Sequence, residues 1–265
     1  MKQETLPSDI ALAGMHDVPA EEVRPGTLYI VSTPIGNLND ITFRAIHILS
    51  SVDIIAAKDT RTTKILLNHY RIQKPLVSYF SYNEVRRVPE LIAKLKTGGT
   101  IALVSDAGTP GISDPAYKII RAALDEKLSV ISIPGPAAFL PALVASGLPM
   151  DRFIFEGFLP TKKGRKTLFE KLSTEERTII LYESPHRLLR TLNDLIEYFG
   201  DRQISVSREL TKKFEETVRG TLSSAIAHFT SHAIRGEFVL VIAGLHYNAS
   251  KGYVKNGDSR GEELP

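Results

Sequence analysis

The stretch LVSDAGTPGISDPAYKIIRAAL, Leu103–Leu124, decides the fold of this chain. An apolar run ends at Val104, and a long corner of Gly, Pro, Ser, Thr and Asp follows before a helical pattern begins. Pro115 suits the first turn of that helix, and Ser113 or Asp114 suits its N-cap. A strand, a small-residue corner and a helix form the unit of a parallel α/β sheet, in which ligands bind beyond the carboxyl ends of the strands. Because glycines let the backbone approach a ligand closely, we expect a binding corner here.

The same alternation of strand and helix patterns recurs about five times around this stretch, from Gly26 onward. It predicts an α/β domain with a mainly parallel sheet and helices on both faces. Beyond residue 148, strand-like segments surround longer helices at RKTLFEKLS and PHRLLRTLNDLIEYFG, which predicts a second α/β domain with a more mixed sheet. We therefore expect a tail over residues 1–22, α/β domains over 23–148 and 149–246, and a polar tail over 247–265.

The composition of the chain narrows the classes of protein to which it can belong. Its 265 residues are 43% hydrophobic and 24% charged, as in ordinary globular domains, and a net charge of +3 is too small to identify a partner. The absence of cysteine excludes disulfides and thiolate catalysis, and the histidines show no metal-ligand spacing, so we expect no metal. Without a membrane-length apolar run or a signal-peptide pattern, we expect a cytoplasmic protein with no membrane partner.

Four corners share a richness in Gly, Pro and small polar residues, and each directly follows a predicted strand. They are STPIGN (32–37), SDAGTPGISDP (105–115), PGPAA (134–138) and YESPH (182–186). One such corner alone is more often an ordinary turn, but four at the carboxyl ends of strands favour a ligand site. None contains the GxxxxGK(S/T) or GxGxxG pattern that cradles phosphates, so a small uncharged or zwitterionic ligand fits better than a pyrophosphate.

Segments along most of the chain resemble one known family. In order they are GTLYIVSTPIGNLNDITFRAI (26–46), AKDTR (57–61), LVSDAGTPGISDP (103–115), PGPAA (134–138), EGFLP (156–160), ESPHR (183–187) and GEFVLVIAG (236–244). Together they resemble the bacterial ribosomal RNA small subunit methyltransferase I family, which belongs to the tetrapyrrole-methylase-like, class III S-adenosylmethionine methyltransferases. SDAGTPGISDP and STPIGN are the most specific of these motifs.

This resemblance implies a fold, a reaction and partners. It implies two α/β domains with S-adenosylmethionine (SAM) in the cleft between them, 2′-O-methylation of a cytidine in small-subunit (16S) rRNA, free or in the assembled 30S subunit, and a homodimer. Asp106 is expected to meet the positive end of the methionine part or to order the loop, and Asp114 to contact SAM or only to cap a helix. The implied cofactor-binding residues are Thr33, Pro34, Gly36, Asn37, Asp106, Ala107, Gly108, Thr109, Pro110, Ser113, Asp114, Pro134, Gly135, Ala138, Tyr182, Glu183, Gly236, Phe238 and Val239.

Methyl transfer is an in-line displacement at a carbon that the sulfonium already activates, so the protein mainly positions the 2′-oxygen. A general base would assist a ribose hydroxyl by about 10²–10⁴-fold. In AKDTR, Lys58 stands where the family usually has an acidic residue, and a phosphate contact suits this lysine better than the role of a base. The candidates for the base, which the sequence does not rank, are Asp59, Glu84, Asp106 and Glu183.

RNA binding requires cations that contact phosphates. Lysine and arginine cluster next to the predicted ligand corners, although a solvated surface is the alternative for each residue taken alone. In YFSYNE, the residues Tyr79, Phe80 and Tyr82 either stack on bases or simply end a strand, and the strand end is favoured. The candidates for RNA binding are Arg61, Lys162, Lys163, Arg165, Arg187, Lys212 and Lys213.

Other functions stay open at this point. A methylase of the same fold would act on a tetrapyrrole precursor, another small molecule or a protein side chain, but STPIGNLND (32–40) departs from the GxGPGDP-type first corner of those relatives. A non-catalytic RNA-binding protein would keep the fold and lack SAM binding. An enzyme with a phosphate ligand would use the glycine corners as anion nests, which the missing phosphate motifs disfavour.

Overall fold

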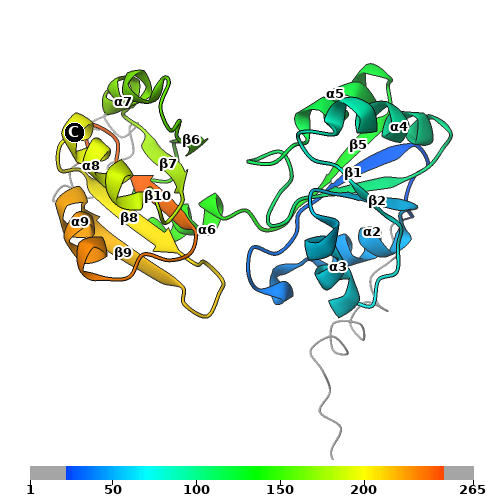
Figure 1. Cartoon of the computed structure of the whole chain (residues 1–265), viewed down its shortest axis with the longest axis horizontal. Coiled ribbons are helices and arrows are strands. Elements are labelled where there is room, and N and C mark those ends of the chain that lie inside the picture. The colour runs from blue at the N-terminus through cyan, green and yellow to red at the C-terminus, as the bar shows by residue number, and fades with distance from the viewer. Residues whose placement is uncertain (1–21, 248–265) are drawn as a thin grey trace, which may run out of the picture. The chain divides into compact units, whose positions relative to one another are not determined.

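The computed structural model describes residues 22–247, and the chain divides into two compact units after Ala137 (Figure 1). The predicted tails, 1–22 and 247–265, lie almost entirely outside the described residues. The division comes earlier than the boundary predicted after residue 148. Helix α6 (Phe139–Ser146) packs against the sheet of the second unit, which explains why it belongs there.

The first unit is a five-stranded parallel sheet with helices on both faces, as the alternating pattern predicted (Figure 1). The strand order is β3-β2-β4-β1-β5, and every neighbouring pair is parallel. The carboxyl ends of all five strands therefore lie at one edge. The elements are β1 (Thr27–Val31), a 3-10 helix (Leu38–Asp40), α2 (Phe43–Ser51), β2 (Ile54–Ala57), α3 (Thr60–His69), β3 (Leu76–Ser78), α4 (Glu84–Lys96), β4 (Ile101–Val104), α5 (Tyr117–Asp125) and β5 (Ser129–Ile133).

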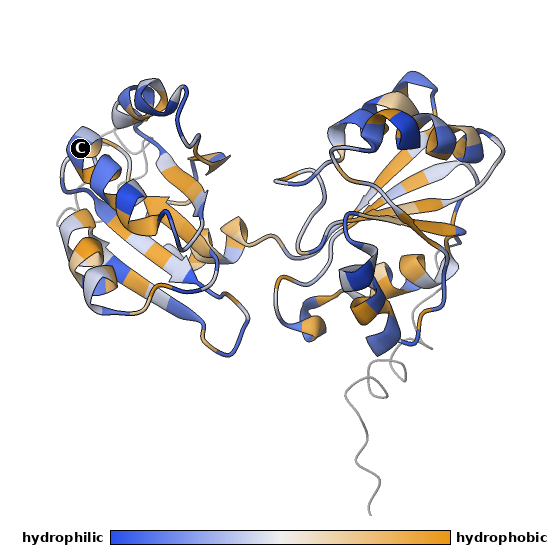
Figure 2. Cartoon of the chain, in the orientation of Figure 1, coloured by the Kyte–Doolittle hydropathy of each residue, from blue (hydrophilic) through white to orange (hydrophobic). Residues whose placement is uncertain are grey.

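The core of the first unit has two layers, because successive side chains of a strand point to opposite faces of the sheet. Tyr29 and Val31 of β1 pack with residues of α2 and α3. Leu28 and Ile30 of the same strand pack with residues of α4 and α5. Strand β1 is buried along its whole length, as expected for a central strand covered on both faces. Figure 2 shows the result, with apolar strands between helices that carry polar residues.

The second unit is built on a mixed sheet, as predicted, whose five strands have the order β6-β7-β10-β8-β9 (Figure 1). Strands β6 and β7 are parallel, whereas β10 runs antiparallel to both β7 and β8, and β9 runs antiparallel to β8. Strands β6, β7 and β8 consequently share one direction, and their carboxyl ends share one edge. The remaining elements are β6 (Phe153–Phe158), α7 (Arg165–Ser173), β7 (Thr178–Glu183), α8 (Leu188–Phe199), β8 (Gln203–Arg208), β9 (Glu216–Thr221), α9 (Leu222–Ser231) and β10 (Phe238–Ile242).

Helix α9 is an element that the sequence patterns did not predict. Its residues Leu222, Ala225 and Phe229 are buried, at the spacing of one helix face. Thr221 caps the helix, and its side chain and that of Ser224 form a reciprocal capping box. The start signal was therefore present in the sequence, but small polar residues within the segment concealed the apolar period.

Candidate functional site

Four loops of the first unit emerge at the carboxyl edge of its parallel sheet. They follow β1 (residues 32–37), β2 (58–59), β4 (105–115) and β5 (134–137). Because the four strands are neighbours in the sheet, their loops lie side by side at the usual ligand position of an open α/β fold. We call this arrangement the four-loop site, and it contains most of the predicted cofactor-binding residues.

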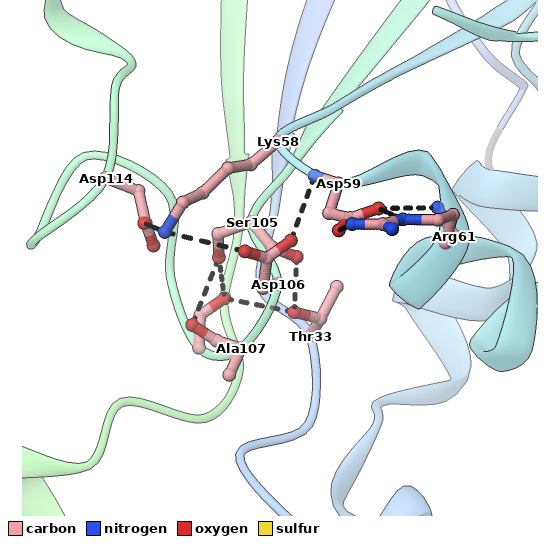
Figure 3. Close-up of polar contacts among 9 residues, drawn as sticks. Thr33, Lys58, Asp59, Arg61, Ser105, Asp106, Ala107 and Asp114 are labelled. Carbon is pink, nitrogen blue, oxygen red and sulfur yellow. Dashed lines mark hydrogen bonds and ion pairs between the residues drawn. The ribbon is translucent and has the colours of Figure 1, made fainter. Parts of the chain in front are cut away.

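The loops after β1 and β4 form one hydrogen-bonded structure. Thr33 and Gly108 bridge both ways, with each amide donating to the carbonyl of the other residue at 3.0 and 2.9 Å. The Thr33 hydroxyl donates to the Ser105 carbonyl at 3.3 Å, and the Ser105 hydroxyl donates to the Gly108 carbonyl at 3.0 Å (Figure 3). Gly108 has a φ of +80°, a left-handed conformation that favours glycine.

The loop after β5 joins the same structure through two hydroxyl groups. The hydroxyl oxygens of Ser32 and Thr109 lie 2.8 Å apart, and the Thr109 hydroxyl donates to the Pro136 carbonyl at 3.0 Å. Gly135 lies so close to the first loop that a Cβ atom there would come within 2.8 Å of the Ser32 Cβ. Any larger residue would force the loops apart, so this approach requires a glycine.

Lys58, which follows β2, lies between two carboxylates of the loop after β4. Its ammonium nitrogen is 2.7 Å from Oδ1 of Asp114 and 3.5 Å from Oδ2 of Asp106 (Figure 3). The hydrogen bond to Asp114 raises the pKa of Lys58 above its ordinary value, against the opposing effect of burial. The lysine therefore stays charged at neutral pH, whereas a catalytic base would need a lowered pKa.

Helix α5 begins later than the sequence predicted. Its first residue is Tyr117, and Ala116 is the N-cap without a side-chain hydrogen bond. The prediction that Ser113 or Asp114 caps this helix is therefore wrong. The physical reason is that the carboxylate of Asp114 is hydrogen bonded to Lys58, across the loop from the helix.

Two of the carboxylates proposed as a base are committed to partners inside the first unit. Both oxygens of Asp59 accept hydrogen bonds from the Arg61 guanidinium, at 3.1 and 2.7 Å, and this contact lowers the pKa of Asp59 to about 2. So acidic a group is a weak base at neutral pH. Glu84 is buried, accepts a hydrogen bond from the Tyr79 hydroxyl at 3.0 Å and pairs with Lys118 at 2.8 Å.

The carboxylate of Asp106 has fewer close partners than those of Asp59 and Glu84. Its Oδ1 accepts a hydrogen bond from the Asp59 amide at 3.0 Å, so the side chain orders the loop, as one of its two predicted roles required. Its Oδ2 faces Lys58 at 3.5 Å, and 33% of the side chain is exposed. Asp106 therefore has a partly exposed carboxylate, and its Oδ2 has only this long ion pair among residues 22–247.

The carboxyl edge of the second sheet contains a buried charged cluster around Glu183, the last residue of β7. Glu183 is 1% exposed. Its Oε1 accepts a hydrogen bond from the Ser184 amide at 2.8 Å and lies 3.3 Å from the Arg187 guanidinium. Its Oε2 accepts a hydrogen bond from the Thr191 hydroxyl at 2.6 Å. With both oxygens occupied, Glu183 has the surroundings of a structural residue.

Two arginines that were predicted to bind RNA are engaged in the same region. Arg165 is 5% exposed and pairs with Asp194 at 2.6 Å. Arg165 also donates to the Pro160 carbonyl at 3.1 Å, and Arg187 donates to the Leu159 carbonyl at 2.6 Å. Because the two guanidinium groups hold the backbone of the loop after β6, we assign Arg165 and Arg187 a role in positioning this loop and not in contacting RNA.

Other cations predicted to bind RNA are exposed. Lys162 and Lys163 lie in the loop after β6, and Lys213 lies in the loop between β8 and β9. The Arg61 side chain is 89% exposed, although it pairs with Asp59 at 2.7 Å. The predicted RNA-binding set thus divides by exposure. Lys162, Lys163, Lys213 and Arg61 are exposed, whereas Arg165, Arg187 and Lys212 are partly or fully buried and ion-paired.

The remaining cofactor-binding candidates are divided between the two units. Those of the second unit lie at the ends of β7 and β10 or at the start of α6, where the Tyr182 hydroxyl accepts a hydrogen bond from the Phe139 amide at 3.2 Å. In the first unit they are Pro34, Gly36, Asn37, Ala107, Pro110, Ser113 and Pro134, and in the second they are Ala138, Tyr182, Gly236, Phe238 and Val239.

Sequence reasoning missed three hydroxyl residues that organise these loops. Ser32 and Ser105 end the buried strands β1 and β4 and tie their loops together, and Thr191 joins the cluster around Glu183. The two serines lie inside the quoted corner motifs, so their position was visible. The Ser32 hydroxyl bonds to Thr109, 77 residues away, whereas the Ser105 hydroxyl bonds to Gly108 within its own loop. For Thr191 we find no local signal.

Known proteins resemble this chain in sequence and fold. Residues 27–226 match the sequence model of the family Tetrapyrrole (Corrin/Porphyrin) Methylases. Ribosomal RNA small subunit methyltransferase I of Synechocystis sp. (strain ATCC 27184 / PCC 6803 / Kazusa) is 56% identical over 221 residues, which cover 83% of this chain and 79% of that protein. The protein of the same name from Thermotoga maritima is 48% identical, with 83% and 99% covered. The solved structure of cobalt precorrin-4 methyltransferase has a TM-score of 0.61 at 16% identity, with 82% and 95% covered, which shows the fold alone.

Proposed function

Because the chain belongs to the tetrapyrrole methylase family and, within it, to the ribosomal RNA small subunit methyltransferase I group, we propose that it methylates the ribose 2′-oxygen of a cytidine in small-subunit (16S) rRNA, with SAM as the methyl donor. The observation that carries this proposal is an identity of 56% and 48% with two proteins of that name over 83% of this chain. The name supports the rRNA substrate, and the cytidine and its 2′-oxygen follow from the motif resemblance.

The four-loop site suits SAM by the chemistry of its groups. The partly exposed carboxylate of Asp106 offers a partner for a positively charged sulfonium or ammonium. Pro134 and Pro136 lack N–H donors, so the corner that contains them presents mainly carbonyl oxygens. The residues that fit this cofactor are therefore Asp106 and the backbone of 107–110 and 134–136. When bound, SAM supplies a methyl group already activated for transfer.

Asp106 is also our candidate for the group that accepts the proton of the ribose hydroxyl. Of the four carboxylates considered, Asp59 is held by Arg61, and Glu84 and Glu183 are buried with their oxygens occupied. Asp106 keeps a partly exposed carboxylate, with one oxygen in only a long ion pair to Lys58, at the edge where the cofactor is expected. A positioned base contributes about 10²–10⁴-fold to such a reaction.

Replacing Lys58 with methionine is expected to weaken SAM binding by about two- to fivefold, the effect of losing a partly exposed ion pair that restrains a binding loop. In the wild-type protein this contribution should not titrate near neutral pH. Because the folded-state pKa of Lys58 is raised, the contribution is complete below the ordinary value of 10.5 and is lost only as the pH rises above the raised value. Isothermal titration with SAM at several pH values measures both effects.

The matched control for this prediction is Lys64→Met, which removes an exposed lysine from helix α3. The control should bind SAM like the wild type, and Lys58→Arg should retain most of the affinity because it keeps the charge. Two results would contradict a role of the Lys58 ion pairs in SAM binding. One is unchanged affinity in Lys58→Met, and the other is a wild-type affinity that falls between pH 6 and pH 8 with the titration of an ammonium.

The form of the RNA acceptor, the cellular location and the oligomeric state also belong to this proposal, and they rest on the rRNA substrate and on the resemblance in sequence motifs. We propose that the acceptor is either the rRNA itself or the assembled 30S subunit, that the protein acts in the cytoplasm and that it forms a homodimer. None of the described helices has the length and apolar character needed to cross a membrane.

The alternative substrates receive less support. The solved cobalt precorrin-4 methyltransferase and uroporphyrin-III-C-methyltransferase share only the fold with this chain, at 16% and 17% identity. A tetrapyrrole precursor is therefore not favoured over rRNA, which appears in the name of relatives that are about three times more similar in sequence.

Labelled SAM tests the proposed function directly. The acceptors are purified small ribosomal subunits that lack the modification and the corresponding naked rRNA. We expect label in a 2′-O-methylated cytidine after nuclease digestion, and the better acceptor identifies the form of the substrate. SAM binding without label in either RNA would exclude the rRNA substrate, and absence of SAM binding would exclude the enzyme.

A further inference from the structure

Two loops at the carboxyl edge of the second sheet pair a phenylalanine with lysines. Phe158 ends β6 and is followed by LPTKK (159–163), and the loop between β8 and β9 contains TKKF (211–214). Because β6, β7 and β8 run in the same direction, both loops leave the same edge of the sheet. The order β6-β7-β10-β8 separates them by three strand spacings, about 14 Å along the sheet.

Both phenylalanine rings are exposed although they are large and apolar. Phe158 is 55% exposed and Phe214 is 68% exposed. Phe158 contacts Tyr182 in an edge-to-face arrangement with 5.6 Å between ring centres, and Phe214 lies 5.6 Å from the ammonium of Lys213. Each ring therefore has one supported side and remains exposed to a further contact.

The loop after β6 is held rigidly beneath its exposed residues. Arg187 donates to the carbonyl of Leu159, and the buried Arg165 donates to the carbonyl of Pro160. The two lysines that follow, Lys162 and Lys163, are exposed and form no ion pair among residues 22–247, so their charges face solvent. The two arginines thus fix the backbone while the ring and the lysines of the loop stay accessible.

The loop between β8 and β9 is braced in a comparable way. The Lys212 ammonium donates to Glu209 at 2.9 Å and to Glu237 at 3.2 Å. Glu215 accepts a hydrogen bond from the Thr211 amide at 2.5 Å. The acidic groups around this loop are therefore engaged within the protein. Lys213, next to the exposed ring of Phe214, supplies the positive charge that the loop presents to solvent.

We propose that this edge of the second sheet binds a single-stranded segment of the rRNA substrate. Bases stack on Phe158 and Phe214, and Lys162, Lys163 and Lys213 contact the phosphates. Stacking on exposed aromatic rings beside lysines is the usual chemistry of single-strand recognition, whereas a duplex hides the faces of its bases. This inference rests on the proposed function and specifies the form of RNA that the protein recognises.

The test compares a labelled single-stranded RNA of about 16 nucleotides with the same strand paired to its complement, by fluorescence anisotropy at constant salt. We expect the wild type to prefer the single strand. Phe158→Ala and Phe214→Ala should each weaken single-strand binding by about 5- to 150-fold, which corresponds to about 1–3 kcal/mol per stacked base. Phe158→Trp should retain binding and Phe158→Leu should not, because an aromatic face is required.

The control is Phe43→Ala, which removes a 51% exposed ring from α2 of the first unit and should bind RNA like the wild type. Equal binding of duplex and single strand, no binding of either, or wild-type binding by both alanine variants would overturn the inference. So would a change of oligomeric state in Phe158→Ala, measured by sedimentation, because the ring would then belong to a protein contact. Methyl transfer by the wild type is measured separately, so failure of the proposed function is distinguishable.

Discussion

Replacement of Asp106 by asparagine is expected to lower the kcat of methyl transfer by about 10²–10⁴-fold, while the Kd of SAM changes by only a few-fold. Asparagine keeps an oxygen that can accept the hydrogen bond from the Asp59 amide, which is 3.0 Å long in the wild type. The loop should therefore keep its conformation, and the loss should report the missing base. Single-turnover methylation of small subunits gives the rate, and calorimetric titration gives the affinity for SAM.

A suitable control for this substitution is Asp125→Asn. Its carboxylate lies on the surface of α5, is 62% exposed and pairs with Arg121 at 2.6 Å. It should leave the rate and the affinity unchanged. A wild-type rate in Asp106→Asn would remove Asp106 from catalysis. A rate that recovers at saturating SAM would show that Asp106 acts through cofactor binding and is not the base.

Replacement of Glu183 by alanine is expected to lower the free energy of unfolding of the second unit by about 3–5 kcal/mol, the cost of removing one partner from a buried ion pair. The Arg187 guanidinium would lose its carboxylate, and the Thr191 hydroxyl would lose its acceptor. For a unit of this size the loss corresponds to a fall in Tm of about 13–22 °C. Thermal and urea denaturation followed by circular dichroism measure the change.

Two further variants decide whether Glu183 is structural. Glu170→Ala removes a 53% exposed carboxylate from helix α7 and should change the free energy of unfolding by less than about 0.5 kcal/mol. Glu183→Gln keeps the volume and one acceptor oxygen, so it should lose less stability than Glu183→Ala. A folded Glu183→Gln protein whose kcat falls by about 100-fold or more would contradict the structural role and restore Glu183 as a candidate base.

The sequence predicted the architecture of the first unit well because its signals are local. Buried strands such as β1 appear as apolar runs, and the corner motifs follow them directly. Predictions failed where a tertiary contact competed with a local preference. Asp114 has the side chain of a helix cap but binds Lys58, and α6 follows a corner of the first unit but packs on the second sheet. Helix α9 was missed because small polar residues weaken its apolar period.

By itself, the sequence predicted the alternation of strands and helices, three of the four loops at the carboxyl edge of the first sheet, and the family with its methyl-transfer chemistry; the fourth predicted corner, 182–186, follows β7 in the second sheet. These follow from periodicity and from motifs of consecutive residues, which do not depend on distant neighbours. Only the tertiary structure decided which charges are available. Arg165 and Lys163 lie in the same basic run, yet Arg165 meets Asp194 from a helix 29 residues further along the chain, and Lys163 stays exposed. A buried charge needs a partner, and folding alone determines which residues become partners.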